Sequence, residues 1–220
     1  MLRPRYSPEQ LLEKYRSIRN SSSTEQFMRS PRHNKTQEIW CATHFAKAFK
    51  NEFGPCWIHI SDNDEQEPAD FWFEFKEKQY PFQITMALDP KRRLGDEYRD
   101  FEEKGHVTRL EDPSRGTELG ASWISQRIEA KANQYGSKAS ALNLLVYLNF
   151  TAYDQQYASI RIASIEHATK FHSVWLINGN AFCCIKQGDD LPSFELWRVA
   201  SETLAHTEAY ISPIANHLGG

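Results

Sequence analysis

A row of three polar side chains marks the part of this sequence best suited to chemistry. Residues 71–75 and 80–88 alternate between two kinds of side chain, which is the pattern of two strands with unlike faces. If the strands pair as a hairpin across the short charged turn between them, their apolar side chains share one face. Asp70, Gln83 and Thr85 then share the opposite face. A carboxylate, an amide and a hydroxyl on an otherwise apolar ribbon indicate a candidate site.

Basic residues on either side of this ribbon could contact phosphates. A helix expected over 89–104, with Asp89 as its N-cap and Pro90 at its first position, is strongly basic. The polar segment 28–35 is either a solvated loop or a mobile basic arm. The candidates for phosphate contact are Arg32, Lys35, Arg92, Arg93 and Arg99. Because the net charge is -3, any nucleic-acid surface must be local.

A further acid, Glu38, lies on the helix expected over 36–53. This helix is the clearest in the sequence, because its apolar residues recur at helical spacing: Ile39, Ala42, Ala46, Phe49 and Phe53. Glu38 stands in its first turn, where the helix dipole favours an acid even without a catalytic role. Glu38 therefore has a structural explanation as well as a functional one.

The remaining pattern predicts alternating helices and strands. Helices are expected over 8–18, 121–134 and 159–169, and strands over 56–61, 142–150, 173–177, 181–185 and 194–199, with a connecting segment over 106–120. This order predicts an α/β (α+β) fold, a single layered domain with a central mixed sheet flanked by helices. We expect an N-terminal helix and basic arm (1–35), the domain itself (36–200) and a loosely attached tail (201–220).

Composition narrows the class of protein. Cys41, Cys56, Cys183 and Cys184 lie in apolar segments without a CxxC spacing, which favours buried, reduced thiols. The chain has no apolar run long enough to cross a membrane and no secretory signal at its start, so we expect a cytoplasmic protein. The motifs of serine hydrolases, zincins, P-loop proteins and Rossmann folds are absent.

The tryptophans are expected in the core. Trp57, Trp72, Trp123 and Trp175 lie in apolar segments, and such residues pack inside more often than they stack on nucleic-acid bases. His167 and His172 have no acid or cysteine pattern near them, so a structural role is expected for both.

The polar row and the element order together resemble the PD-(D/E)XK nuclease superfamily. Residues 68–70 (PAD) and 83–85 (QIT) look like its two half-motifs, separated by 12 residues. Residues 126–150 (QRIEAKANQYGSKASALNLLVYLNF) are similar to its following helix and strand, with Lys131 and Tyr135 where many members carry QxxxY. The stretch 82–99 (FQITMALDPKRRLGDEYR) resembles a small family of uncharacterised bacterial proteins in that superfamily. The resemblance implies a restriction-endonuclease-like core.

The resemblance also implies a metal-dependent nucleic-acid phosphodiesterase. Asp70 matches the first motif acid and Glu38 the optional helix acid; Gln83 occupies the place of the second acid and Thr85 that of the lysine. Asp70, Gln83 and Glu38 would then hold Mg²⁺. Glutamine offers oxygen without charge and threonine offers no positive charge, so Arg93 or Lys131 would have to replace the lysine.

The same departures leave an alternative open. A nuclease fold with a lost active site would act as a nucleic-acid- or protein-binding regulatory module. DNA or another nucleic acid is the partner implied in the first case, and no membrane is expected. The sequence leaves the oligomeric state open, a homodimer included.

Overall fold

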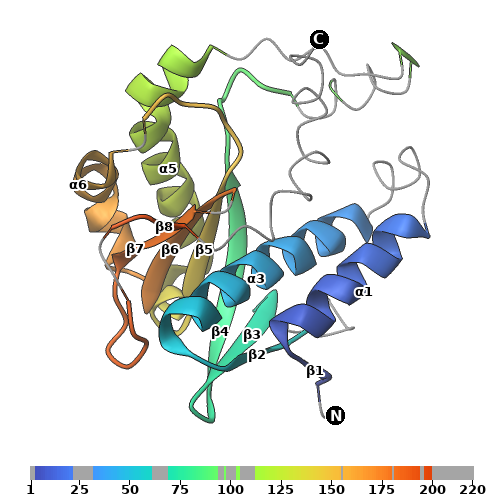
Figure 1. Cartoon of the computed structure of the whole chain (residues 1–220). Coiled ribbons are helices and arrows are strands. Elements are labelled where there is room, and N and C mark those ends of the chain that lie inside the picture. Colours follow the sequence, from blue (N-terminus) through green and yellow to red (C-terminus); the bar gives the residue numbers. More distant parts are fainter. Residues whose placement is uncertain are drawn as a thin grey trace.

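The computed structural model describes residues 3–21, 32–60, 69–93, 97, 103–104, 112–154, 156–179, 181–193 and 196–199. Within these ranges the chain forms one mixed sheet with helices on both of its faces (Figure 1). The predicted fold class is therefore confirmed. In chain order the elements are β1 (Arg5–Tyr6), α1 (Pro8–Asn20), α3 (Arg32–Phe53), β2 (Cys56–His59), β3 (Phe71–Phe75), β4 (Lys78–Ala87), α5 (Pro113–Tyr135), the 3-10 helix η1 (Gly136–Ala141), β5 (Asn143–Leu148), α6 (Tyr157–Ala168), β6 (Ser173–Asn178), β7 (Ala181–Lys186) and β8 (Arg198–Val199).

The described strands lie in the sheet in the order in which they occur in the chain. β1 to β4 are antiparallel to one another, β4, β5 and β6 are parallel, and β7 and β8 close the sheet antiparallel. Parallel neighbours need a crossover, and α5 and α6 supply the two crossovers on either side of β5. All six residues of β5 are buried, as its apolar sequence predicts.

Each face of the sheet has its own hydrophobic core. The first core lies under α1 and α3 and is mainly aromatic, because Phe45 of α3 packs its ring against those of Phe73, Phe82 and Trp175. The second core lies under α5 and α6 and is built from β5, β6 and β7 with Ala87 of β4. It takes no residue from β1, β2 or β3.

Several predicted elements match the structure closely. The N-terminal helix begins at Pro8 with Ser7 as its cap, and it packs against α3. The hairpin of β6 and β7 and the buried, reduced state of the four cysteines are also as predicted. Trp123 and Trp175 are buried in the core, whereas Trp57 and Trp72 are only half-buried and belong to neither core cluster.

Other boundaries were wrong for physical reasons. α5 begins at Pro113 rather than 121, because Asp112 caps it by accepting a hydrogen bond from the Ser114 amide at 2.9 Å. Residues 113–120 of the expected connecting segment are thus helical, with Gly116 buried inside the helix. After β4, Pro90 and Lys91 form a turn in which Asp89 accepts the Lys91 amide, rather than a helix start.

Parts of some predictions fall outside the described residues. Most of the helix expected over 89–104, the arm before Arg32 and the tail over 201–220 are among them. In the part of the chain that the structure describes, no helix is both long enough and apolar enough to span a membrane.

His44 gives α3 a pH-dependent stability. Its side chain is 2% exposed and packs on Trp40 with ring centroids 4.0 Å apart, and among the described residues neither ring nitrogen has a hydrogen-bond partner. Burial, and to a smaller degree the positive charge of Lys47, lowers the pKa of His44 to about 3. In the folded chain His44 therefore stays neutral at pH values at which it is protonated in the unfolded chain, that is, below the ordinary histidine pKa of about 6.5.

We expect the free energy of unfolding to fall as the pH drops from about 6.5 toward 3, because only the unfolded state gains this proton. Urea denaturation at pH 7 and at pH 4.5 measures the change. His44→Leu removes the group and should reduce the pH dependence in this window. An equal dependence in wild type and variant would contradict the assignment.

A close approach of α5 to the loop after β5 gives a second stability prediction. A Cβ atom at Gly116 would lie 1.8 Å from the carbonyl oxygen of Thr151, which is backbone and cannot turn away. Gly116→Ala should therefore push the helix off the loop and destabilise the fold by about 1–3 kcal/mol.

Thermal or urea unfolding of Gly116→Ala, beside the exposed-site control Asn133→Ala on the same helix, tests this expectation. Asn133→Ala should be neutral or slightly stabilising, because alanine is the better helix former. Two variants of equal stability would show that the helix and the loop are not in tight contact.

Candidate active site

The candidate site lies where β4 continues beyond the end of β3. The two strands pair from Phe75 opposite Lys78 to Phe71 opposite Phe82, while β4 runs on to Ala87 beside β5. Among the described residues β3 extends no further than Phe71. The edge of β4 that faces away from β5 therefore loses its strand partner at the next residue.

Asp70 supplies the hydrogen-bonding groups at that edge of β4. Its backbone amide donates to the carbonyl oxygen of Phe82 at 2.8 Å, and its carboxylate accepts the backbone amide of Ile84 at 2.6 Å. A backbone amide that has lost its strand partner needs another acceptor, and this carboxylate supplies one. Asp70 is thereby fixed at the edge of β4 by Phe82 and Ile84.

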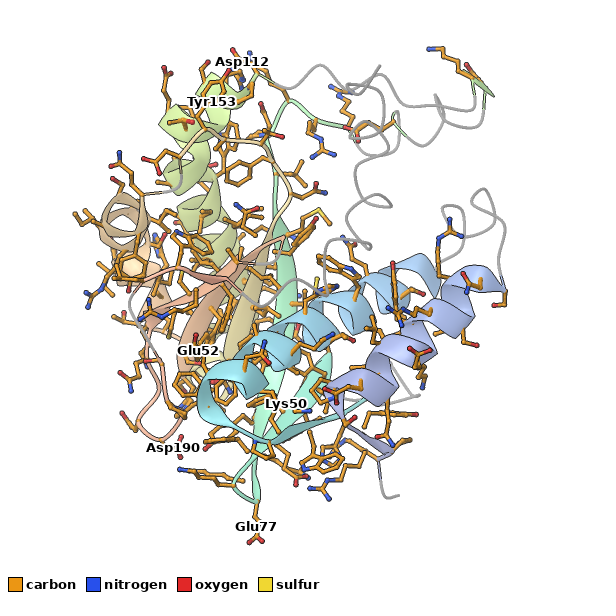
Figure 2. The ribbon with its side chains drawn as sticks, in the orientation of Figure 1. Lys50, Glu52, Glu77, Asp112, Tyr153 and Asp190 are labelled. Atoms are coloured by element: carbon orange, nitrogen blue, oxygen red, sulfur yellow. The ribbon has the colours of Figure 1, made fainter. Side chains whose placement is uncertain are left out.

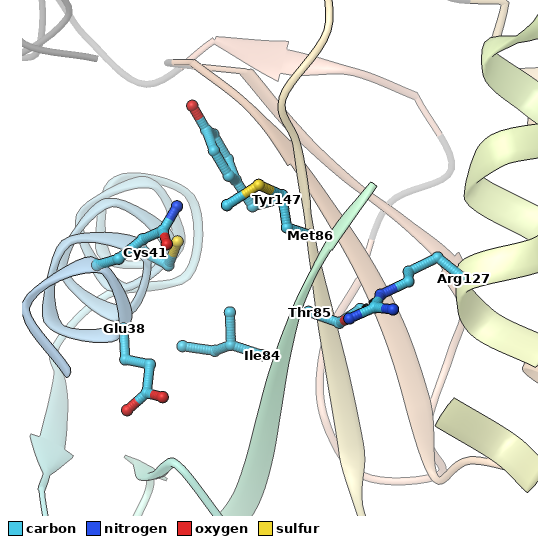
Figure 3. Close-up of a pocket in the computed structure, with 8 residues that line it drawn as sticks. Glu38, Cys41, Ile84, Thr85, Met86, Arg127 and Tyr147 are labelled. Carbon is cyan, nitrogen blue, oxygen red and sulfur yellow. Dashed lines mark hydrogen bonds between the residues drawn. The ribbon is translucent and has the colours of Figure 1, made fainter. Parts of the chain in front are cut away.

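A pocket of about 290 Å³ opens at the same edge. Its lining residues are Gln37, Glu38, Cys41, Ile84, Thr85, Met86, Arg127 and Tyr147. Figure 3 shows Glu38 and Cys41 projecting from α3 on one side of β4 and Arg127 reaching from α5 on the other side. Because β3 has ended, groups from both faces of the sheet line one pocket.

Arg127 is held against the polar face of β4. Its Nε donates a hydrogen bond to the hydroxyl oxygen of Thr85 at 2.6 Å. Thr85 occupies the position where the resemblance leads one to expect a lysine. A guanidinium group from α5 thus stands beside that position (Figure 3).

Lys131 and Tyr135 follow Arg127 at intervals of four, so the three side chains lie along one face of α5. The Lys131 ammonium is 5.5 Å from the centre of the Tyr135 ring. Burial lowers the pKa of Lys131 and Arg127 lowers it further, while the negative charges of Asp70 and Glu38 act in the opposite direction. Burial and the charge of Asp70 together raise the pKa of Tyr135.

The two acids also act on the same neighbour within α3. Burial raises the pKa of the Cys41 thiol far above its usual range, and the charges of Glu38 and Asp70 raise it further. Cys41 therefore lines the pocket as a protonated thiol. Glu38 forms an ion pair with Lys35, with nitrogen and oxygen 3.5 Å apart. Glu38 and Asp70 thus act on both Cys41 and Lys131, and Arg127 acts on Lys131 as well.

The other sequence-predicted site residues lie in varied places. Gln83 is 5% exposed, and like Asp70 and Lys131 it is not among the residues that line the pocket. Arg93 is exposed on the segment after β4 and does not line the pocket. Arg92 is largely buried, because its guanidinium binds Glu97 and the backbone and side-chain oxygens of Asn149.

Two predicted phosphate contacts cannot be placed. Arg99 lies outside the described residues, and so does the side chain of Arg32, although its backbone begins α3. Lys35 is placed by its ion pair with Glu38, so its ammonium group lies near the pocket.

Arg127 is the site residue that sequence reasoning missed. From the sequence, Arg127 is placed on the helix expected over 121–134, with no role assigned to it. The spacing of Arg127, Lys131 and Tyr135 was the available signal, because residues four apart share a helix face. This spacing alone could not assign Arg127 to the site, because it does not show that Thr85 faces the same helix.

The donor set suits a weakly held, hard divalent cation. Magnesium is commonly bound by one or two protein carboxylates together with substrate phosphate oxygens. Asp70 and Glu38, two of the predicted ligands, are carboxylates, and Gln83, the third, has a neutral amide oxygen. In the ranges that the structure describes, no group of three or more His, Cys, Asp and Glu side chains could hold a metal ion. The magnesium assignment thus stays a prediction.

Comparison with solved structures finds one weak likeness. The matched chain is a protein of unknown function, PA4535 of Pseudomonas aeruginosa strain PAO1, described as a member of the monooxygenase superfamily. The two chains are 14% identical, with a TM-score of 0.47 over 90% of this chain and 96% of that one. No curated protein matches this chain significantly.

Comparison with family profiles gives a match over nearly the whole chain. The profile described as "Putative endonuclease, protein of unknown function (DUF1780)" matches residues 10–204, which include every element from α1 to β8 except the start of α1. The match agrees with the sequence's likeness to a family of nucleases. The chain belongs to the DUF1780 family.

Proposed function

We propose that this chain is a metal-dependent phosphodiesterase that cleaves nucleic acid at the end of β3. The carrying observation is the hydrogen bond of Arg127 to Thr85, because it brings a positive charge to the motif position that lacks lysine. The family's description as an endonuclease and the order of helix, three antiparallel strands, helix and buried strand support the proposal. The site would be a variant of the PD-(D/E)XK type.

The acids would position the metal. Asp70 and Glu38 would hold Mg²⁺, with the amide oxygen of Gln83 as a neutral third donor. The bound ion would supply charge neutralisation at the scissile phosphate and a more acidic water. Asp70 is well suited to a fixed role, because the Ile84 amide anchors one of its oxygens. With one carboxylate fewer than the usual motif, metal affinity should be low, so substrate phosphates would complete the site.

The bases of α5 would stabilise the negative charge that develops on the phosphate. Arg127 is held in a fixed direction by Thr85 and already faces the pocket. A cation that is already in position stabilises the transition state most strongly in a partly desolvated site, because neither protein nor solvent has to reorganise during the reaction. Lys131, one helical turn further along, would add a second positive charge. The lowered pKa of Lys131 fits a group that holds its proton only loosely.

Binding without cleavage is the competing function. It is favoured by Gln83, which removes a motif acid, and by the ion pair of Glu38 with Lys35. The measurement below separates the two functions, because it follows cleavage and binding in the same variants.

The proposal predicts metal-dependent cleavage of plasmid or single-stranded DNA with Mg²⁺ or Mn²⁺. Arg127→Met should lower the rate by about 10²–10³-fold, the usual effect of removing one preorganised charge-stabilising group. Arg161→Met, which removes an exposed arginine from α6, is the matched control and should leave the rate unchanged.

Asp70 needs a variant that separates chemistry from folding. Asp70→Asn keeps an oxygen that can accept the Ile84 amide but loses the negative charge, whereas Asp70→Ala loses both. We expect Asp70→Asn to be folded and inactive, and Asp70→Ala to be inactive and less stable as well. Cleavage by Asp70→Asn at the wild-type rate would overturn the proposed site. DNA binding without any cleavage by the wild type would favour the competing function.

A further inference from the structure

In the described part of the chain, no helix covers the face of β1, β2 and β3 that points away from α3, and this face carries aromatic and charged side chains. Along β2 and β3, Ile58 and Phe73 point into the first core. Their neighbours in the chain, among them Trp57 and Trp72, therefore point to the opposite face. The second core takes nothing from these strands, and Figure 1 shows α5 and α6 over the other half of the sheet.

Trp57 and Trp72 are placed as a pair on this open face. In the register of β2 and β3, Trp57 lies opposite Glu74, and Trp72 lies opposite His59. The two tryptophans are therefore diagonal neighbours across the strand pair, about 7–8 Å apart at the backbone. Both tryptophans are half-buried.

Each tryptophan is paired with an arginine. The guanidinium of Arg5 lies 4.1 Å from the centre of the Trp57 ring, and that of Arg3 lies 4.4 Å from the centre of the Trp72 ring. Arginine over an aromatic ring forms a flat, positively charged platform. Two such platforms side by side present planar surfaces and positive charge together.

A buried acid fixes one of these platforms. Glu74 accepts a hydrogen bond from the Arg5 guanidinium at 2.5 Å and contacts Nε2 of His59 at 2.6 Å. The carboxylate is nearly buried, whereas the Arg5 side chain is 49% exposed. The inner edge of the guanidinium is thus tied to the sheet while the rest of the group stays open to solvent.

The surface approaches Asp70 along β3. Asp70 stands two positions before Trp72 in the chain, and it is tied to β4 by its two hydrogen bonds. A ligand lying on Trp72 would have its next unit beside Asp70. The platforms therefore lie where the substrate of the proposed phosphodiesterase would enter or leave.

We infer that this face of β1, β2 and β3 binds the bases of single-stranded nucleic acid on its two arginine–tryptophan pairs, Arg5 with Trp57 and Arg3 with Trp72. The inference rests on the proposed function and names its substrate class. Single-stranded nucleic acid is the occupant that fits, because its bases are free to stack on aromatic and guanidinium planes, while those of a duplex are stacked on each other. Arg3 and Arg5 supply positive charge that complements its phosphates.

The test is the affinity for a labelled oligodeoxythymidine of about 12 nucleotides, measured by fluorescence anisotropy in EDTA so that no cleavage occurs. Trp57→Leu and Trp72→Leu should each weaken binding by about tenfold or more. Trp72→Phe should keep most of the affinity, because phenylalanine preserves a stacking surface. A duplex of equal length should bind more weakly than the single strand.

The matched control is Tyr153→Leu. Tyr153 is an aromatic residue with 79% exposure, and Figure 2 shows it beside Asp112 at the opposite end of the molecule from Glu77, the tip of the hairpin of β3 and β4. Its loss should leave the affinity unchanged. If a tryptophan variant does not fold, Arg3→Gln offers a second route and should weaken binding and reduce its salt dependence.

The outcomes separate this inference from the proposed function. Wild-type affinity in both tryptophan variants, or tighter binding of the duplex, would overturn the inference even if Asp70-dependent cleavage is present. Tryptophan-dependent binding of the single strand without any cleavage would support the surface and contradict the phosphodiesterase. Absence of measurable binding by the wild type, with both strands and in low salt, would also overturn the inference.

Discussion

The site depends on one hydrogen bond at the end of a strand. β3 stops at Phe71, and the carboxylate of Asp70 accepts the Ile84 amide that a longer β3 would have bound. If β3 continued, it would cover the edge of β4 and separate the two faces of the sheet. Because it stops, α3 and α5 can contribute side chains to one pocket although they lie on opposite faces.

This arrangement also distributes the charges. The acids come from the α3 side and the strand end, and the bases come from α5, so that Glu38, Asp70, Arg127 and Lys131 influence the same groups. The large aromatic core under α3 and the tight contact of Gly116 with Thr151 fix the two helices that carry these side chains. Stability and site geometry thus depend on the same packing.

The sequence predicted the hairpin well because strand alternation is a local property. Apolar side chains every second residue were enough to predict that Phe71, Phe73 and Phe82 share the core face. The start of α5 was missed because Pro113, Gly116 and Gly120 suggest a loop, whereas Pro113 begins the helix and Gly116 permits a close contact. Only the tertiary structure reveals such a contact.

The role of Arg127 and the exposure of Trp57 and Trp72 were likewise hidden in the sequence. The partner of Arg127 is Thr85, 42 residues away, which no local pattern connects to it. Trp57 and Trp72 look like core residues because they lie in apolar segments. The part of a sheet that a helix covers depends on how the strands are connected along the chain. Here both crossover helices, α5 and α6, lie over β5, β6 and β7.

The central claim is that acids from α3 and from the strand end share one site with the bases of α5. The pKa of the Lys131 ammonium, measured by NMR, tests it most directly, because both acids raise this pKa. Removing either negative charge, in Asp70→Asn or in Glu38→Gln, should lower the pKa of Lys131. An unchanged pKa in either variant would contradict a shared site.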